Sequence, residues 1–201
     1  WTNTSHSAST RADGLMLWTL SLEDGLPKSI ETTLTYKEWL SFSPKGKLLM
    51  VSGIGRELWL NKKLAMADLK TGRLDYPKIP SGKAALDPAL SPDGNRMAFV
   101  AAEEMDVSEF YEDQEAWIEN RSLWIADANG ANAKELGNAG NNIYNPLWSK
   151  DGSHILYVRD KALWLIEADG ENPRKIVEIS PDDSWGFYGH IRFTDAFDWH
   201  Q

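Results

Sequence analysis

The chain has 201 residues, of which 42% are hydrophobic and 25% are charged, a composition that indicates a globular protein. Its net charge of −9 argues against a nucleic-acid partner, because phosphate binding requires clustered Lys and Arg, and the absence of cysteine excludes disulfides and zinc held by cysteine. No apolar run approaches the roughly 18 residues of a transmembrane helix, so we expect no membrane insertion in this segment.

The first predicted elements are two short strands, at 15–20 and 28–31, that flank a turn at Asp24-Gly25. From about residue 37 the chain repeats one unit: a short strand, a serine turn ending in glycine, an apolar strand, a Leu-Trp strand, a second glycine turn and a fourth strand. The serine turns read Ser43-Pro44-Lys45-Gly46, Ser91-Pro92-Asp93-Gly94 and Ser149-Lys150-Asp151-Gly152. Asp-Gly favours a hairpin because both central positions adopt positive φ at low cost.

The remaining strands of the unit follow each serine turn in a fixed order. Second strands are predicted at 47–52, 96–101 and 154–159. Third strands, beginning with Leu-Trp, are predicted at 123–127 and 163–167, and a degraded copy at 64–72 has Ala65 in the tryptophan place. Fourth strands are predicted at 74–79, 134–136 and 174–177.

Self-similarity at a spacing near fifty residues is typical of stacked or radial repeat architectures. Four-stranded antiparallel units predict an all-β fold, a β-propeller in which each unit is one blade. A β-sandwich is the competing interpretation, but it would not require the same turn in every unit. We expect Trp18, Trp124 and Trp164 to take equivalent third-strand positions and to be substantially buried.

The blade boundaries leave two half-blades at the ends of the chain. Whole blades are predicted at 37–80, 87–137 and 144–180, and a shared blade would combine 15–31 with 189–201. In a closed four-bladed ring, residues 190–199 would pair with 15–20 and remove the free sheet edges. The alternative is a fragment of a six- or seven-bladed propeller, which the start at Trp1 in place of Met favours. The sequence leaves both open.

These turns and Leu-Trp strands resemble the TolB-like propellers, also called the WD40-like Asp-repeat family of bacteria. The resemblance covers roughly residues 15–180 and is best around 89–136 and 146–179. It implies a propeller from the bacterial cell envelope, periplasmic or extracellular. Members of this family include binding proteins, the front domains of prolyl-oligopeptidase-like enzymes and some pectin-fragment lyases. The chain departs from TolB itself, since no α/β domain precedes the repeats.

No motif predicts a catalytic, cofactor or metal site. The G-x-S-x-G elbow of hydrolases, the Walker loop and the H-E-x-x-H pair are all absent. His190, Asp195, Asp198 and His200 are close in sequence, but residues of opposite parity on a strand point to opposite faces. Asp93 and Asp151 are expected to stabilise their own turns.

An acidic insertion is the most individual feature of the chain. Residues 103–115 carry seven acids and no base, and they join the second and third strands of one blade. This places the insertion on the same face as the connections at 137–146 and 180–190. We expect a partner to contact this rim through Glu109, Phe110, Tyr111, Glu112, Asp113, Trp117, Asn142, Tyr144, Trp185 and Tyr188. The alternative is a solvated loop, partly helical, whose aromatic side chains pin it to the propeller.

Two functions follow from the sequence. The first is a non-catalytic propeller of the bacterial envelope or exterior that recognises a protein or a glycan through its loops. The alternative is the propeller domain of a prolyl-oligopeptidase-like peptidase or of a polysaccharide lyase. No cofactor is expected in either case.

Overall fold

The computed structural model describes residues 2–3, 15–33, 36–53, 57–105, 112–179 and 199. Over these residues the fold is all-β with antiparallel strand pairs, as predicted. They also contain one α-helix, α1 (Glu112–Glu119), and two 3-10 helices, η1 (Lys37–Trp39) and η2 (Gly137–Ala139). Within these ranges no helix has the length and apolar character needed to cross a membrane.

The first sheet has seven strands within the described residues. They are β1 (Thr2–Asn3), β2 (Leu15–Leu20), β3 (Pro27–Thr33), β4 (Leu40–Ser43), β5 (Lys47–Ser52), β6 (Lys63–Asp68) and β7 (Leu74–Asp75). Strands β4 to β7 form a meander in chain order. The β2–β3 hairpin joins this meander through a single residue pair, Thr33 opposite Ser52. On its other side β2 pairs with the short strand β1.

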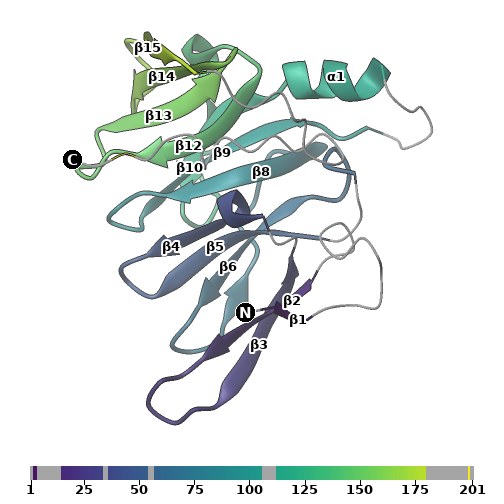
Figure 1. Ribbon diagram of the computed structural model, residues 1–201, viewed down its shortest axis with the longest axis vertical. Coiled ribbons are helices and arrows are strands. Elements are labelled where there is room, and N and C mark those ends of the chain that lie inside the picture. Colours follow the sequence, from purple (N-terminus) through teal and green to yellow (C-terminus); the bar gives the residue numbers. More distant parts are fainter. Residues whose placement is uncertain are drawn as a thin grey trace.

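Two further sheets repeat the same four-stranded meander. The second contains β8 (Lys83–Leu90), β9 (Arg96–Glu103), β10 (Ser122–Asp127) and β11 (Lys134–Glu135). The third contains β12 (Ile143–Trp148), β13 (His154–Arg159), β14 (Ala162–Glu167) and β15 (Arg174–Glu178). The three meanders lie side by side in sequence order (Figure 1), and β8 contacts both β4 and β12.

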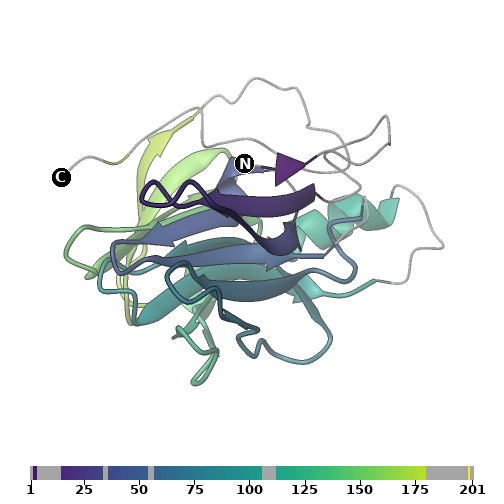
Figure 2. The ribbon, with the colours of Figure 1, turned by 90° about the horizontal axis from the view of Figure 1, so that it is seen from below.

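The connections fall at two opposite ends of the strands. Figure 2 shows α1 at one end and hairpin turns at the other. We call the first the α1 end and the second the hairpin end, where the three serine turns lie. Since α1 joins β9 to β10, the helix occupies the position predicted for the acidic insertion.

The serine turns differ from the predicted geometry. The N–H of Gly94 donates to the carbonyl of Ser91 at 2.8 Å, so the central residues of the turn are Pro92 and Asp93, and not the Asp-Gly pair. Gly94 follows them with a φ of 67°, in the left-handed region that glycine adopts without strain. The Asp93 carboxylate accepts hydrogen bonds from Ser91 Oγ and from the backbone N–H of Asn95, at 2.6 and 3.1 Å. The expected role of Asp93 in its own turn is therefore confirmed.

The strand register confirms the equivalence of the tryptophan positions. Trp124 lies opposite Phe99, Trp164 opposite Tyr157, and Ala65 opposite Met50. Ala65 thus does occupy the tryptophan place of its meander. The predicted burial was too high, because Trp18, Trp124 and Trp164 are all only partly buried. Trp124 and Trp164 each lie beneath a cation near the surface, Lys83 Nζ at 5.6 Å and Arg159 Cζ at 4.4 Å from the ring centroid.

The main core fills the space between neighbouring meanders. Its centre includes one fully buried side chain from each second strand, Leu49, Phe99 and Tyr157. Because successive residues of a strand face opposite sides, Leu48 and Met50 of β5 point into a smaller cluster, shared with Leu17 of the β2–β3 hairpin. The β5 strand is therefore buried on both faces.

The predicted ring closure falls largely outside the described residues. Of 190–199, the structure describes only Trp199, which is partly buried against the main core. Among the described strands no sheet closes on itself, and β1 covers part of the β2 edge. The pairing of 190–199 with 15–20 and the blade boundaries stay predictions.

Candidate functional site

The first strands of the second and third sheets, β8 and β12, share a bulge at the same place. The register of β8 shifts between Leu86 and Ala89, and that of β12 shifts between Tyr144 and Leu147. The bulges contain the dipeptides Asp87-Pro88 and Asn145-Pro146. Proline cannot donate to a ladder, and Asp and Asn tolerate the left-handed conformation better than other non-glycine residues. The observed φ angles, 48° at Asp87 and 47° at Asn145, agree with this account.

The Asp87 carboxylate joins its own strand, β8, to η1 on one side and to β12 on the other. It is buried, Oδ1 accepts from Trp39 Nε1 at 3.0 Å, and Oδ2 accepts from the backbone N–H of Asn145 at 3.1 Å. Trp39 precedes β4, so the first, second and third meanders are joined through one side chain. A further bond, from Trp148 Nε1 to the carbonyl of Ala89 at 3.0 Å, fixes the same pair of strands.

Arg121 lies beside this link, between α1 and β10 at the α1 end. It is 2% exposed, and its guanidinium carbon lies 3.7 Å from the centroid of the Tyr144 ring and 5.7 Å from that of Trp117. The loss of hydration lowers the pKa of Arg121, an effect that the nearby Tyr144 and Asp87 oppose. Among the described residues Arg121 forms no ion pair, and its Nε and Nη2 atoms are buried without a hydrogen-bond partner.

Two amides near Arg121 also carry buried atoms without partners. Asn145 is 4% exposed, and neither Oδ1 nor Nδ2 of its side chain has a hydrogen-bond partner. Asn142 donates through Nδ2 to Asp160 Oδ1 at 3.1 Å, but its own Oδ1 is buried and unpartnered. The backbone holds these residues together, because the N–H of Ile143 donates to the carbonyl of Arg121 at 3.2 Å.

We refer to Asp87, Arg121, Asn142, Tyr144 and Asn145 as the Arg121 cluster. It combines a buried cation, an aromatic face and amide groups with unused donors and acceptors. Each unsatisfied buried polar group costs about 1–3 kcal/mol, and more when it is charged. Chemically, such a set can bind and orient a polar or anionic group.

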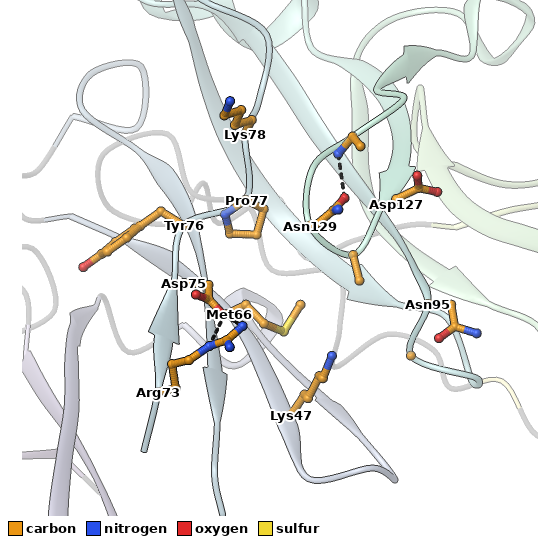
Figure 3. Close-up of a pocket in the computed structure, with 13 residues that line it drawn as sticks. Lys47, Met66, Arg73, Asp75, Tyr76, Pro77, Lys78, Asn95, Asp127 and Asn129 are labelled. Atoms are coloured by element: carbon orange, nitrogen blue, oxygen red, sulfur yellow. Dashed lines mark hydrogen bonds and ion pairs between the residues drawn. The ribbon is translucent and has the colours of Figure 1, made fainter. Parts of the chain in front are cut away.

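A concavity lies at the hairpin end, between the first and second meanders (Figure 3). Its volume is about 690 Å³. It is lined on one side by Lys47 and the segment from Arg73 to Lys78, and on the other by Asn95 and the turn from Asp127 to Ala131. Figure 3 shows the Arg73 guanidinium turned toward Asp75, with which it forms an exposed ion pair at 2.5 Å. The lining carries both signs of charge and is open to solvent.

The structure places the predicted rim residues in three groups. Glu109, Phe110, Tyr111, Trp185 and Tyr188 lie outside the described residues. Glu112 and Asp113 form the first turn of α1. The other three, Trp117, Asn142 and Tyr144, surround or belong to the Arg121 cluster.

Trp117 and Tyr144 are not exposed contact residues, because their side chains are only 3% and 4% exposed. Trp117 instead anchors α1 to β9: its Nε1 donates to the carbonyl of Glu103 at 2.7 Å, and its ring lies edge-on to Trp59. The pinning of the insertion by an aromatic side chain is thus confirmed for Trp117. Both residues support the α1 end from beneath.

Sequence reasoning missed Asp87, Arg121 and Asn145. One signal was present, because Asp87-Pro88 and Asn145-Pro146 each begin four residues before the serine of their unit. No sequence pattern distinguishes Arg121, which becomes buried where α1 packs against β9. The groove at the hairpin end gave no signal either, since two different sheets form its walls.

Comparisons with known proteins support the fold more than a family. No protein-family model matches the chain. The "Uncharacterized peptidase YuxL" of Bacillus subtilis (strain 168) is 32% identical over 89 residues, which are 44% of this chain and 11% of that protein.

Solved structures match over most of the chain at low identity. TolB from Acinetobacter baumannii has a TM-score of 0.56 at 19% identity, over 85% of this chain and 40% of its own. Oligogalacturonate lyase in complex with manganese gives 0.57 at 13%, over 88% and 45%, and acylaminoacyl peptidase gives 0.57 at 19%, over 89% and 30%. The chain spans less than half the length of each, and it shares with them an all-β, TolB-like fold.

Proposed function

We propose that this chain is part of a TolB-like β-propeller that binds a protein or a glycan at its α1 end and catalyses no reaction itself. The three meanders would be successive blades, with β4, β8 and β12 innermost. Support comes from their equivalent registers and from the structural likeness to TolB. The resemblance of the sequence to bacterial TolB-like propellers also supports a periplasmic or extracellular location, which fractionation of cells would test.

The observation that carries the binding function is the Arg121 cluster. Stable folds seldom retain a buried cation without a hydrogen-bonded counter-charge, because its desolvation is not offset. Such groups are kept where they serve recognition, at some cost in stability. The cluster lies under the same end that carries α1 and the connection at 137–142, where the acidic and aromatic residues of the sequence also predict a partner.

The test compares two matched charge reversals, Glu119→Lys and Glu171→Lys. Both glutamates are exposed, but Glu119 ends α1 and Glu171 lies in a turn at the hairpin end. The chain is presented to peptide and oligosaccharide arrays, with retention measured on the array and cleavage measured by mass spectrometry. We expect retention without cleavage that is changed by Glu119→Lys, in the direction set by the charge of the ligand, and unchanged by Glu171→Lys. Cleavage by this chain, or loss of retention only with Glu171→Lys, would contradict the proposal.

The second candidate is the propeller domain of a peptidase. The 32% identity to a Bacillus peptidase over 89 residues favours it, as does the likeness to acylaminoacyl peptidase. In that case the parent reading frame would encode a hydrolase domain with a G-x-S-x-G elbow. Joining such a domain to this chain would then yield peptidase activity that the chain lacks alone.

A further inference from the structure

Within the described part of the chain, three arginines stack over aromatic rings, and Arg121 differs from the other two. Arg96 lies 4.7 Å from the Trp148 ring centroid, and its Nη2 donates to the carbonyl of Gly152 at 2.8 Å. Arg159 lies 4.4 Å from the Trp164 ring centroid, and its Nη1 donates to the carbonyl of Ala139 at 2.9 Å. In each case the ring holds the guanidinium while a backbone carbonyl accepts from it. Arg96 and Arg159 therefore each have both an aromatic ring and a hydrogen-bond acceptor within the fold.

Arg121 has the ring but lacks the acceptor. It is the closest of the three to its aromatic ring, at 3.7 Å from Tyr144, and it is almost completely buried. Its two orphaned atoms, Nε and Nη2, lie on the same edge of the planar guanidinium. The N–H groups of that edge point in parallel and match the two oxygens of a carboxylate.

No protein carboxylate occupies this edge among the described residues. The nearby Asp87 uses Oδ1 for Trp39 and Oδ2 for the backbone of Asn145, so its described bonds run along the strands and not to Arg121. The unused amide of Asn145 lies beside that backbone bond and offers a further donor and acceptor. Tyr144 adds an apolar wall, since its ring is buried.

We propose that the Arg121 cluster is a binding site for a carboxylate group, held by Nε and Nη2 of Arg121 and assisted by the Asn145 amide. The inference deepens the proposed binding function and rests on it. In the present conformation the donors are covered, so binding requires the cover to shift. The free energy lost to the orphaned donors is recovered when the carboxylate arrives, which favours the shift. The carboxylate belongs to a peptide C-terminus or to an acidic sugar.

The energetic signature of such a site differs from that of a structural arginine. If Arg121 serves a ligand, replacing it with the apolar Met removes two buried donors that have no acceptor, so we expect the free protein to become more stable although it loses the attraction to Asp87. If Arg121 is structural, as Arg159 is, the same replacement makes the protein less stable. We therefore expect Arg121→Met to raise the Tm and Arg159→Met to lower it. A lower Tm for Arg121→Met would overturn the proposal.

Binding is tested with small probes on the wild-type chain. N-acetylglycine and glucuronate represent the two sources of the carboxylate, and N-acetylglycinamide and glucose are their uncharged controls. We expect one of the acids to raise the Tm and to shift the Arg121 side-chain signal in ¹⁵N NMR spectra, with an affinity at least tenfold above that of its control. Whichever acid binds more tightly identifies the source. Arg159→Met should keep this binding, and Arg121→Met should lose it.

The remaining outcomes separate this inference from the function on which it rests. Chloride serves as a simple anion control. If chloride and both acids raise the Tm equally, or if neither acid raises it, carboxylate recognition is overturned. If the Arg121→Met variant binds an array partner with the same affinity as the wild type, carboxylate recognition is also overturned, while the proposed binding function stands. If no array member binds the wild-type chain, the binding function itself fails.

Discussion

The carboxylate of Asp87 accepts the backbone N–H of Asn145 at 3.1 Å, although the two residues are 58 positions apart in the chain. Both residues lie in the bulge of the first strand of their sheet, and both have a left-handed backbone. The bulge exposes the N–H that an ordinary ladder would have used, and the equivalent residue of the preceding sheet supplies the acceptor. The bulge of each repeat thus supplies the donor or the acceptor of a hydrogen bond that joins one sheet to the next.

We expect Asp87→Ala to destabilise the protein by about 3–5 kcal/mol, since it leaves Trp39 Nε1 and the N–H of Asn145 buried without their acceptor. Urea denaturation measures the change. The exposed Asp160, which accepts from Asn142 at 3.1 Å, is the control, and Asp160→Ala should cost about 1 kcal/mol or less. Equal costs for the two variants would show that Asp87 does not join the sheets.

Gly130→Ala should destabilise the protein far more than Gly25→Ala. Both glycines have positive φ, 85° and 69°, so an alanine is strained at either position. A Cβ at Gly130 would lie 2.2 Å from the backbone N of Lys78, whereas at Gly25 it would meet no atom within 4 Å. We expect about 1 kcal/mol at Gly25 and several times this at Gly130, where the wall of the hairpin-end groove must move. Similar melting temperatures for both variants would contradict this close approach.

The Asp151 turn should lose its stabilising effect in acid. Hydrogen bonds from Ser149 Oγ and from Ser153 hold the pKa of Asp151 well below its ordinary value of 3.8. A carboxyl whose pKa is lower in the folded state stabilises the fold above its unfolded pKa, and the effect disappears as the pH falls below it. The Tm of Asp151→Asn should therefore lie below that of the wild type at pH 6, and the difference should shrink between pH 4 and 2. A difference that does not depend on pH would contradict the assignment.

Stability should rise with pH through the alkaline range because of Lys62. This lysine is 1% exposed, and burial lowers its pKa from 10.5 to about 8. The unfolded chain therefore binds more protons between pH 8 and 10.5, and stability increases with pH across that window. Lys62→Met should reduce this slope in chemical denaturation, and Lys70→Met, at an exposed turn position, should leave it unchanged. The same slope in both variants would show that Lys62 is not its source.

The sequence predicted the parts of the fold that depend on local pattern. The repeated serine and glycine turns and the apolar runs between them located the strands, and the Leu-Trp spacing identified Ala65 as a degraded copy, which its register opposite Met50 confirms. It misplaced the turn centre at Asp93-Gly94, because Pro92 fixes the first central residue and leaves only Gly94 left-handed.

The candidate site was harder to predict because it depends on contacts between sheets. The exposed character expected of Trp117 and Tyr144 was wrong, since Trp117 anchors α1 to β9 and the Tyr144 ring lies against the Arg121 guanidinium. Arg121 has no distinguishing neighbour in the sequence, and only its burial and the missing acceptor mark it. Such a site can be found only once the sheets are placed against each other.

The attachment of the β2–β3 hairpin through Thr33 and Ser52 divides the chain into parts of unequal cooperativity. Each four-stranded meander is tied along whole strands, whereas this hairpin is held by one backbone pair, by the Thr33 hydroxyl, which donates to the carbonyl of Val51, by the Tyr76 hydroxyl, which donates to Glu31, and by the small cluster around Leu17. Subglobal opening is easiest where few buried contacts must break. Detaching the hairpin would open only the small cluster around Leu17 and leave the main core closed, so we expect local opening of the described chain to begin there.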